Sequence, residues 1–364
     1  MNIAFALFRY FPFGGLQRDM AAIAAELVTR GHAVTVFTRD WQGEVPSGIR
    51  VEHLPVRALG NHAADARFVE QVQQHWHDFD VRVGFNKMAG LDFYYAADGC
   101  LAARYGNSLK TFLPRYRVRL AQEAAVFAAG LSTRILSISP PQRQLYQQCH
   151  GTEAARFVGL PPGIRRDRRM PDDFAQRRQQ WRHQQGLADD ARLLLFVGSG
   201  FRTKGLDRAL QAAAGVLRDN DRFVVIGADR ASRYQRQAQA LGIGPQVHFL
   251  GGQDRIPEWL WAADLLLHPA YAENTGTVLL EAAIAGVPVL TTEVCGYAPY
   301  IEQAQMGTVL RSETITAQVL VASTEALLQA PRDSWWPRAR AFADSADIYS
   351  LVAHAADAIT GECA

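Results

Sequence analysis

Two carboxylates, Glu273 and Glu281, flank the start of a predicted helix with seven residues between them. The stretch Leu266–Leu290 has the pattern of a buried strand, a polar loop, a helix opening in Gly and Thr, and a second buried strand. A helix N-terminus favours an anion, and the loop after a strand is where open α/β sheets bind ligands. One turn into the helix, Glu281 can accept hydrogen bonds from vicinal hydroxyls. Phosphate and polyol recognised together indicate a sugar nucleotide, although the spacing alone more often marks a surface loop before a core helix.

Glycine-rich turns follow a predicted strand in each half of the chain. In the first turn, Gly14 and Gly15 let the backbone approach a ligand closely, and Asp19 is either a surface acid or an acceptor for sugar hydroxyls. The second turn carries Arg202 and Lys204, which could neutralise a diphosphate leaving group. A tight turn and a solvated basic loop are the alternatives. The first turn is not G-x-G-x-x-G and no acid ends the second strand, which disfavours a nicotinamide or flavin cofactor.

Polar residues also end two further strands of the first half. Asn86 and Lys87 follow one strand and Asp98 follows another, so they could contact the acceptor or the transferred sugar. Asp98 is equally well explained as a turn residue. Downstream, cations alternate with aromatic and aliphatic residues, which suits either an anionic membrane surface or an ordinary exposed helix. These cations are Arg104, Lys110, Arg115, Arg117 and Arg119.

Composition limits the class of protein. With 364 residues, 48% of them hydrophobic and 20% charged, the chain is expected to form two soluble globular domains. A net charge of +2 gives no reason to expect nucleic acid. No apolar run reaches membrane-spanning length, and the N-terminus has no secretory signal pattern. The four cysteines have no disulfide or zinc spacing and no His cluster has metal spacing, so we expect a cytoplasmic protein without a metal or other cofactor.

Strand and helix patterns alternate along the chain, which favours α/β architecture with mostly parallel sheets. The first series begins with a strand at Asn2–Phe8, a helix at Met20–Arg30 and a strand at Ala33–Thr38. A basic segment rich in Pro and Gly, Gly159–Met170, interrupts the series, and a second begins at Arg192–Val197. We therefore expect two Rossmann-like domains facing each other across a cleft, with one arginine of the linker pointing inward.

Four strings together resemble the family 4 retaining glycosyltransferases of GT-B architecture, over nearly the whole chain. They are Tyr10–Asp19, Val83–Met88, Leu160–Ile164 and His268–Glu281. The resemblance implies an acceptor domain at residues 1–160, a nucleotide-sugar domain at 161–342 and a C-terminal helix, 343–364, that returns to the first domain. It also implies retention of anomeric configuration without an obligatory metal. Within the family the chain is similar to enzymes that move glucose from UDP-glucose to a heptose of the lipopolysaccharide inner core, on the cytoplasmic face of the inner membrane.

The resemblance assigns a role to individual residues. Lys204 pairs with the diphosphate, Glu281 holds the ribose, and Glu273 with the amides after it holds glucose hydroxyls. The implied donor-binding set is Gly14, Gly15, Asp19, Arg168, Arg202, Lys204, Arg255, Ile256, Glu273, Asn274, Thr275, Gly276, Thr277 and Glu281. Lys204, Glu273 and Asp98 are the catalytic candidates, and the backbone at Arg255 and Ile256 matches the segment that contacts uracil. The family has an Arg where this chain has Ser199, so Arg168 or Arg202 is expected to supply that charge.

Three rival functions share this architecture. Another hexosyltransferase of the same family would act on a different cell-surface glycan. A nucleotide-sugar epimerase would also hold UDP but would convert the donor without any acceptor. A non-catalytic sensor would bind a UDP-sugar without turnover. Product analysis with and without an acceptor separates all three from the predicted glucosyltransferase.

Overall fold

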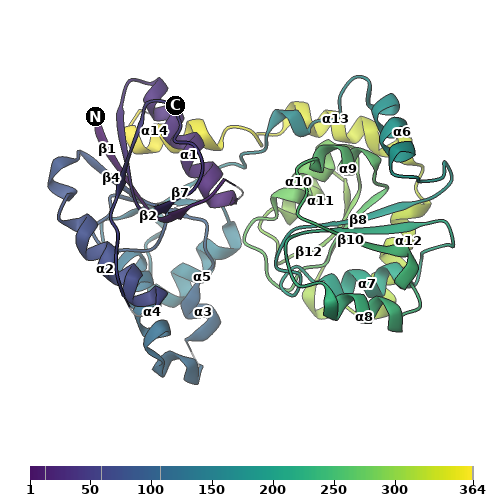
Figure 1. The fold of residues 1–364 in the computed structure, drawn as a ribbon, viewed down its shortest axis with the longest axis horizontal. Helices are drawn as coiled ribbons and strands as arrows, with labels where there is room; N and C mark the ends of the chain where they lie inside the picture. The colour runs from purple at the N-terminus through teal and green to yellow at the C-terminus, as the bar shows by residue number, and fades with distance from the viewer. Residues whose placement is uncertain (13, 59, 107, 363–364) are drawn as a thin grey trace. The chain divides into compact units, whose positions relative to one another are not determined.

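The computed structural model describes residues 1–12, 14–58, 60–106 and 108–362. It divides into two compact units, Met1–Gly163 with Tyr349–Ala364, and Ile164–Ile348. Each unit has one sheet of parallel strands with helices on both faces (Figure 1). The predicted α/β class with two Rossmann-like domains is confirmed. The chain changes units at 163/164 and 348/349, where the sequence placed the changes at 160/161 and 342/343.

The sheet of the first unit has the strand order β3-β2-β1-β4-β5-β6-β7. Its strands are β1 (Asn2–Tyr10), β2 (Ala33–Trp41), β3 (Ile49–His53), β4 (Val81–Gly84), β5 (Phe93–Ala96), β6 (Arg134–Ser137) and β7 (Phe157–Gly159). Its α-helices are α1 (Gly15–Thr29), α2 (Asn61–Gln73), α3 (Leu101–Tyr105), α4 (Pro114–Phe127), α5 (Pro140–His150) and α14 (Leu351–Thr360).

The two faces of β1 are buried against different helices. Ile3, Phe5 and Leu7 join the apolar cluster that includes α1 and α14, while Ala4 and Ala6 join the cluster that includes α2, α4 and α5. Alternate residues of a strand point to opposite faces, so an unbroken apolar strand such as β1 needs cover on both sides. Figure 1 shows α14 beside α1 on one face, with α2, α4 and α5 on the other.

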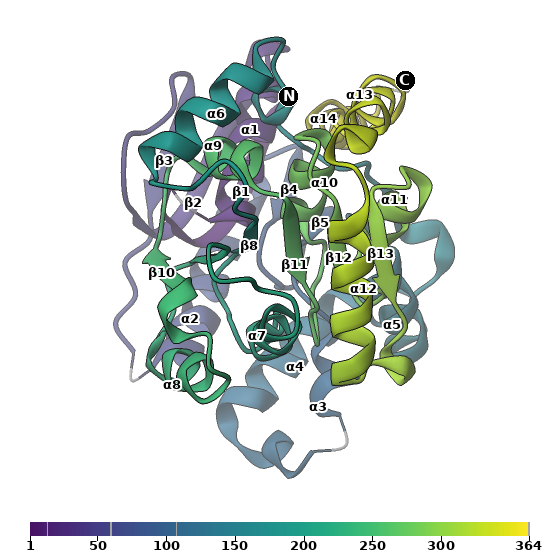
Figure 2. The ribbon, with the colours of Figure 1, turned by 90° about the vertical axis from the view of Figure 1, so that its right-hand side faces the viewer.

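The sheet of the second unit has the strand order β10-β9-β8-β11-β12-β13. Its strands are β8 (Leu193–Val197), β9 (Arg222–Ile226), β10 (Val247–Gly251), β11 (Leu265–His268), β12 (Val289–Thr292) and β13 (Gly307–Leu310). Its α-helices are α6 (Phe174–Gln184), α7 (Leu206–Ala214), α8 (Ser232–Ala240), α9 (Ile256–Ala262), α10 (Thr277–Ile284), α11 (Ala298–Gln303), α12 (Ala317–Gln329) and α13 (Trp335–Ser345). Figure 2 shows α12 lying beside α7.

Each sheet has a point at which the strand order reverses. In the first unit it lies between β1 and β4, and in the second between β8 and β11. The loops that leave neighbouring strands there go to opposite faces of the sheet, which opens a crevice at the carboxyl ends. The turn with Gly14 and Gly15 follows β1, and Asn86 follows β4. Lys204 follows β8 and Glu273 follows β11, so the predicted polar residues occupy these positions in both units.

Candidate functional site

Backbone contacts join the loops after β8 and β11. The N–H groups of Tyr271 and Ala272 donate to the carbonyl oxygen of Thr203, at 2.8 and 3.1 Å. Gly205, the residue before α7, has a φ of +76°, and a Cβ atom there would lie 2.1 Å from the carbonyl oxygen of Pro269. Only glycine allows this approach. The loops are therefore held together by main chain, independently of the side chains they carry.

This packing brings Lys204 onto Glu273. The Lys204 ammonium donates to Oε2 of Glu273, and the N–H of Asn274 donates to Oε1 at 3.1 Å. Nε2 of His268, the last residue of β11, lies 3.4 Å from the same Oε2. Burial raises the pKa of Glu273, but His268 and Lys204 outweigh it and hold that pKa at about 2. Glu273 is therefore an anion at neutral pH, with the side chains of Lys204 and His268 beside it.

A second pair of opposite charges lies at the start of α10. Gly276 precedes the helix in the left-handed conformation, with a φ of +83°, and in the described structure its N-terminus has no side-chain cap. The N–H of Leu279 donates to the carbonyl oxygen of Gly276 at 2.9 Å, so the positions at which this helix start could meet phosphate or hydroxyl oxygens are those before it, Thr277 and Val278. One turn later, Oε1 of Glu281 lies 3.5 Å from Nε of Arg168, and both side chains are largely buried. Arg168 of the linker thus reaches this helix.

The remaining predicted residues of this unit lie at strand ends nearby. Arg202 is exposed in the loop after β8. Ser199, at the position where the family has Arg, accepts a hydrogen bond from the N–H of Ala228 at 3.1 Å. Arg255 is exposed and immediately precedes α9, which begins with Ile256 after β10. Which arginine supplies the family's missing charge stays a prediction, with Arg168 half-buried beside Glu281 and Arg202 at the surface.

In the first unit, the turn after β1 contains a glycine, Gly15, that the surrounding structure does not require. A Cβ atom on Gly15 would meet nothing within 4 Å, and neither Gly14 nor Gly15 has a positive φ. Neither packing nor backbone conformation requires Gly15, whereas close approach by a ligand would. Phe13 lies outside the described residues. Asp19 accepts a hydrogen bond from Tyr95 at 2.7 Å, and burial raises the pKa of Asp19 against the lowering effect of that bond.

The residues predicted to meet the acceptor have contacts within the protein. Oδ1 of Asn86 accepts from the N–H of Phe8 at 2.7 Å. Lys87 is 6% exposed, and its ammonium donates to the carbonyl oxygen of Gly99 at 2.9 Å. Asp98 is exposed after β5. The acceptor roles stay predictions, and the contacts show that the loop after β4 is tied to the strand β1 and to the loop after β5.

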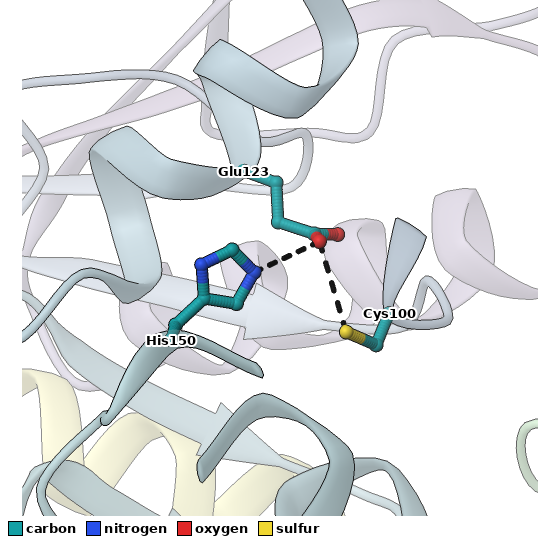
Figure 3. A group of neighbouring side chains, drawn as sticks. All are labelled: Cys100, Glu123 and His150. Carbon is teal, nitrogen blue, oxygen red and sulfur yellow. Dashed lines mark hydrogen bonds and ion pairs between the residues drawn. The ribbon is translucent and has the colours of Figure 1, made fainter. Parts of the chain in front are cut away.

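A buried carboxylate that the sequence did not single out supports these loops. Glu123 on α4 is fully buried and accepts from Lys87 at 2.6 Å and from two N–H groups of α3 at 2.8 Å each. His150 Nε2 and Cys100 Sγ lie 3.0 and 3.7 Å from its Oε1 (Figure 3). Burial raises the pKa of Glu123, but His150 and Lys87 bring it to about 2. The one feature of the sequence that could have pointed to Glu123 is an acidic residue beside an apolar run.

The same cluster is the place in the described structure where side chains could hold a metal. Ligand atoms of Cys100, Glu123 and His150 lie within 4.8 Å of one another, and they are types that zinc accepts. However, Lys87 already neutralises Glu123, and N–H groups and the imidazole occupy its oxygens. The arrangement is accounted for as a charge-compensated network, and we assign no metal to it.

The predicted membrane-facing cations come before and after exposed apolar side chains in the chain. Leu109 is 84% and Phe112 is 77% exposed, in a short 3-10 turn between α3 and α4. The cations Arg104, Lys110, Arg115, Arg117 and Arg119 are exposed on this turn and the adjoining helices. Among the described helices, none combines the length and the apolar character needed to cross a bilayer.

Comparison with known proteins identifies relatives along the whole chain. The family model described as Glycosyltransferase Family 4 matches residues 13–168, and that described as Glycosyl transferases group 1 matches residues 177–343. The lipopolysaccharide glucosyltransferase WaaG of Escherichia coli is 44% identical over 371 residues, covering 99% of both chains. A D-inositol 3-phosphate glycosyltransferase of Geodermatophilus obscurus is 27% identical, covering 81% of this chain and 73% of that protein.

Solved structures agree with these matches. The crystal structure of WaaG, a glycosyltransferase involved in lipopolysaccharide biosynthesis, superposes with a TM-score of 0.91 at 43% identity, covering 99% of this chain and all of that one. Anabaena HepE in complex with UDP-glucose has a TM-score of 0.76 at 18% identity, covering 99% of this chain and 100% of HepE, and shows a shared fold only. The chain therefore belongs to the family 4 glycosyltransferases and has their GT-B fold.

Proposed function

We propose that the protein transfers glucose from UDP-glucose to a heptose of the lipopolysaccharide core, with retention of anomeric configuration. The observation that carries this proposal is the meeting of Lys204 and Glu273 at the strand-order reversal of the second unit. A cation for a diphosphate and a carboxylate for sugar hydroxyls lie side by side there, as a nucleotide-sugar donor requires. The full-length similarity to an enzyme described as a lipopolysaccharide glucosyltransferase supports the choice of donor and acceptor.

In this proposal the second unit binds most of the donor. Lys204, with Arg168 or Arg202, neutralises the diphosphate, and Glu281 accepts hydrogen bonds from the ribose hydroxyls. Glu273 and the N–H groups from Asn274 to Thr277 hold glucose hydroxyls. The backbone at Arg255 and Ile256 contacts uracil. The first unit contributes the open turn at Gly14 and Gly15, together with Asp19.

The reaction breaks the bond between the anomeric carbon of glucose and the phosphate oxygen. A heptose hydroxyl forms its bond to that carbon on the face that UDP leaves, and its proton passes to the departing phosphate oxygen. Lys204, an arginine and the α10 N-terminus stabilise the charge that develops on UDP, without requiring a metal. We assign contact with the glucose or its developing positive charge to Asp98, and contact with the acceptor to the loop of Asn86 and Lys87.

We also propose that the protein binds the cytoplasmic face of the inner membrane through the segment from α3 to α4. Leu109 and Phe112 offer apolar surface to the interface between headgroups and acyl chains, and the surrounding cations offer charge to anionic lipid. The enzyme would then meet its lipid-anchored acceptor at the membrane surface that carries this acceptor.

The decisive experiment supplies UDP-glucose and a truncated, heptose-terminated lipopolysaccharide to the purified protein. We expect the glycolipid to gain the mass of one hexose, and NMR of the product to show the anomeric configuration of the donor. UDP-galactose in a parallel reaction tests the choice of sugar. An epimerised donor without any change in the acceptor, or donor binding without turnover, would exclude the proposed transfer and favour the epimerase or the sensor instead.

A further inference from the structure

One buried side chain next to the proposed sugar-binding carboxylate has no assigned role. His268 ends β11 and is completely buried, and its ring stacks on Phe196 with centroids 6.1 Å apart and planes 18° from parallel. Its Nε2 atom lies 3.4 Å from Oε2 of Glu273. Within the described residues, neither ring nitrogen makes a hydrogen bond of good geometry. Burial lowers the pKa of His268 although Glu273 opposes this, so the ring is neutral at neutral pH.

A neutral imidazole has one N–H group to donate, and a buried donor without an acceptor is costly. The acceptor that the structure places beside His268 is Oε2 of Glu273, slightly beyond an ideal hydrogen-bond distance. That oxygen also receives the ammonium of Lys204. The proposed function requires Lys204 to turn to the diphosphate when the donor binds. The Glu273 carboxylate then loses its cation and needs another donor to keep its orientation.

We propose that His268 is a positioning residue for glucosyl transfer: its Nε2–H group holds Oε2 of Glu273 in place when Lys204 moves to the diphosphate. This inference rests on the proposed function, because it takes Glu273 to hold the hydroxyls of the transferred sugar. His268 itself never touches the donor. Removing His268 must therefore weaken recognition of the sugar part of UDP-glucose and leave recognition of the UDP part unchanged. An aromatic residue needed only for packing would give neither effect once replaced by another aromatic ring.

A double-mutant cycle separates these two roles. The variants are His268→Phe, which keeps a buried ring without N–H groups, Glu273→Gln, and the double variant. Two quantities are measured for each: kcat/KM for UDP-glucose, and the calorimetric affinities for UDP and for UDP-glucose. We expect His268→Phe to lower kcat/KM on the order of 10- to 100-fold, the equivalent of one hydrogen bond to a charged group. UDP affinity should not change, and the double variant should lose no more than Glu273→Gln alone, because the two residues act as one unit.

Two further variants serve as controls. His268→Gln retains an N–H donor that can reach Glu273, and should recover part of the loss. His248→Phe removes another half-buried histidine of the same unit, on β10, whose pKa burial also lowers. It should match the wild type in turnover and in affinity. Thermal unfolding of every variant identifies any that is simply misfolded.

Three results would overturn the role of His268: wild-type kinetics in His268→Phe, losses that multiply in the double variant, or equal losses of affinity for UDP and UDP-glucose. The proposed function fails separately, if the wild type binds UDP-glucose but transfers no glucose to the heptose acceptor. In that case the calorimetric affinities of the four proteins for UDP and UDP-glucose still decide whether His268 acts through Glu273. A wild type that does not bind UDP-glucose would refute both proposals.

Discussion

At the scale of single residues, the contact between Lys204 and Glu273 means that each side chain neutralises the other before the donor arrives. We expect Lys204→Ala to lower kcat by about 100- to 1,000-fold, since a group that stabilises charge on the leaving UDP acts mainly in the transition state. Steady-state kinetics with UDP-glucose measures this, with Lys204→Arg as the variant that keeps the charge. An unchanged kcat with a raised KM would remove Lys204 from the chemistry.

The carboxylate of Glu281 gives a prediction about binding instead of turnover. If it accepts hydrogen bonds from the ribose, Glu281→Ala should weaken the affinity for UDP itself by roughly 1.5–3 kcal/mol. Titration calorimetry with UDP provides the measurement, and Glu302→Ala, which removes an exposed acid from α11 of the same unit, is the control. Undiminished UDP binding in Glu281→Ala would refute the ribose assignment.

At the scale of elements, Glu123 joins α4 to α3 and α5, and this makes the stability of the first unit depend on pH. The pKa of Glu123 in the folded protein is about 2, below its ordinary value of 4.5. Its contribution to the free energy of unfolding is therefore complete above the unfolded value and is lost as pH falls from there toward the folded one. Denaturant unfolding of wild type and Glu123→Gln, compared between neutral and acidic pH, tests this.

We expect the Gln variant to be less stable at neutral pH, because Lys87 is left buried without its counter-charge. The same variant should lose less stability than the wild type on acidification. If acidification lowers the free energy of unfolding equally in the wild type and in Glu123→Gln, the carboxylate of Glu123 is not the titrating group.

The segment from α3 to α4 gives a prediction about lipid. Wild-type protein should co-sediment more strongly with vesicles that contain anionic lipid than with neutral vesicles, and each nearby cation should contribute about 1 kcal/mol. Replacing Leu109 and Phe112 together with Ser should weaken binding to both vesicle types, because it removes exposed apolar area. Leu241→Ser, at an exposed apolar residue of the second unit, is the control. Equal recovery of wild type with neutral and anionic vesicles would exclude the electrostatic part of the proposal.

At the scale of the whole molecule, most of the architecture could be predicted because βα alternation is a local pattern. The strand predicted at Arg192–Val197 differs from β8 by one residue, and those predicted at Asn2–Phe8 and Ala33–Thr38 start where β1 and β2 start. The helix predicted at Met20–Arg30 is α1, which starts earlier, directly after Gly14. The short edge strands β7 and β13 were not predicted, since each has a single buried residue and therefore lacks the apolar run that marks a central strand.

The site could be predicted less completely than the fold. Loops after parallel strands are the expected positions for polar residues, and this placed Lys204 and Glu273 correctly on the second sheet. Which cation meets which carboxylate depends on packing between distant segments, as the approach of Arg168 to Glu281 shows. His268 and Glu123 adjoin apolar runs, so in the sequence they cannot be told from residues of the core.

The return of α14 to the first unit has a consequence during synthesis. Leu351, Ala355 and Ile359 cover an apolar face that includes α1, yet the chain builds all of the second unit between residues 163 and 349 before it reaches them. About 320 residues separate the end of α1 from the start of α14, so at about 5–20 residues per second the face of α1 stays uncovered for roughly 15–65 s. A nascent chain of this protein is therefore a natural client for chaperones that hold hydrophobic segments. A transcript broken before the final helix would leave a product marked for proteolysis.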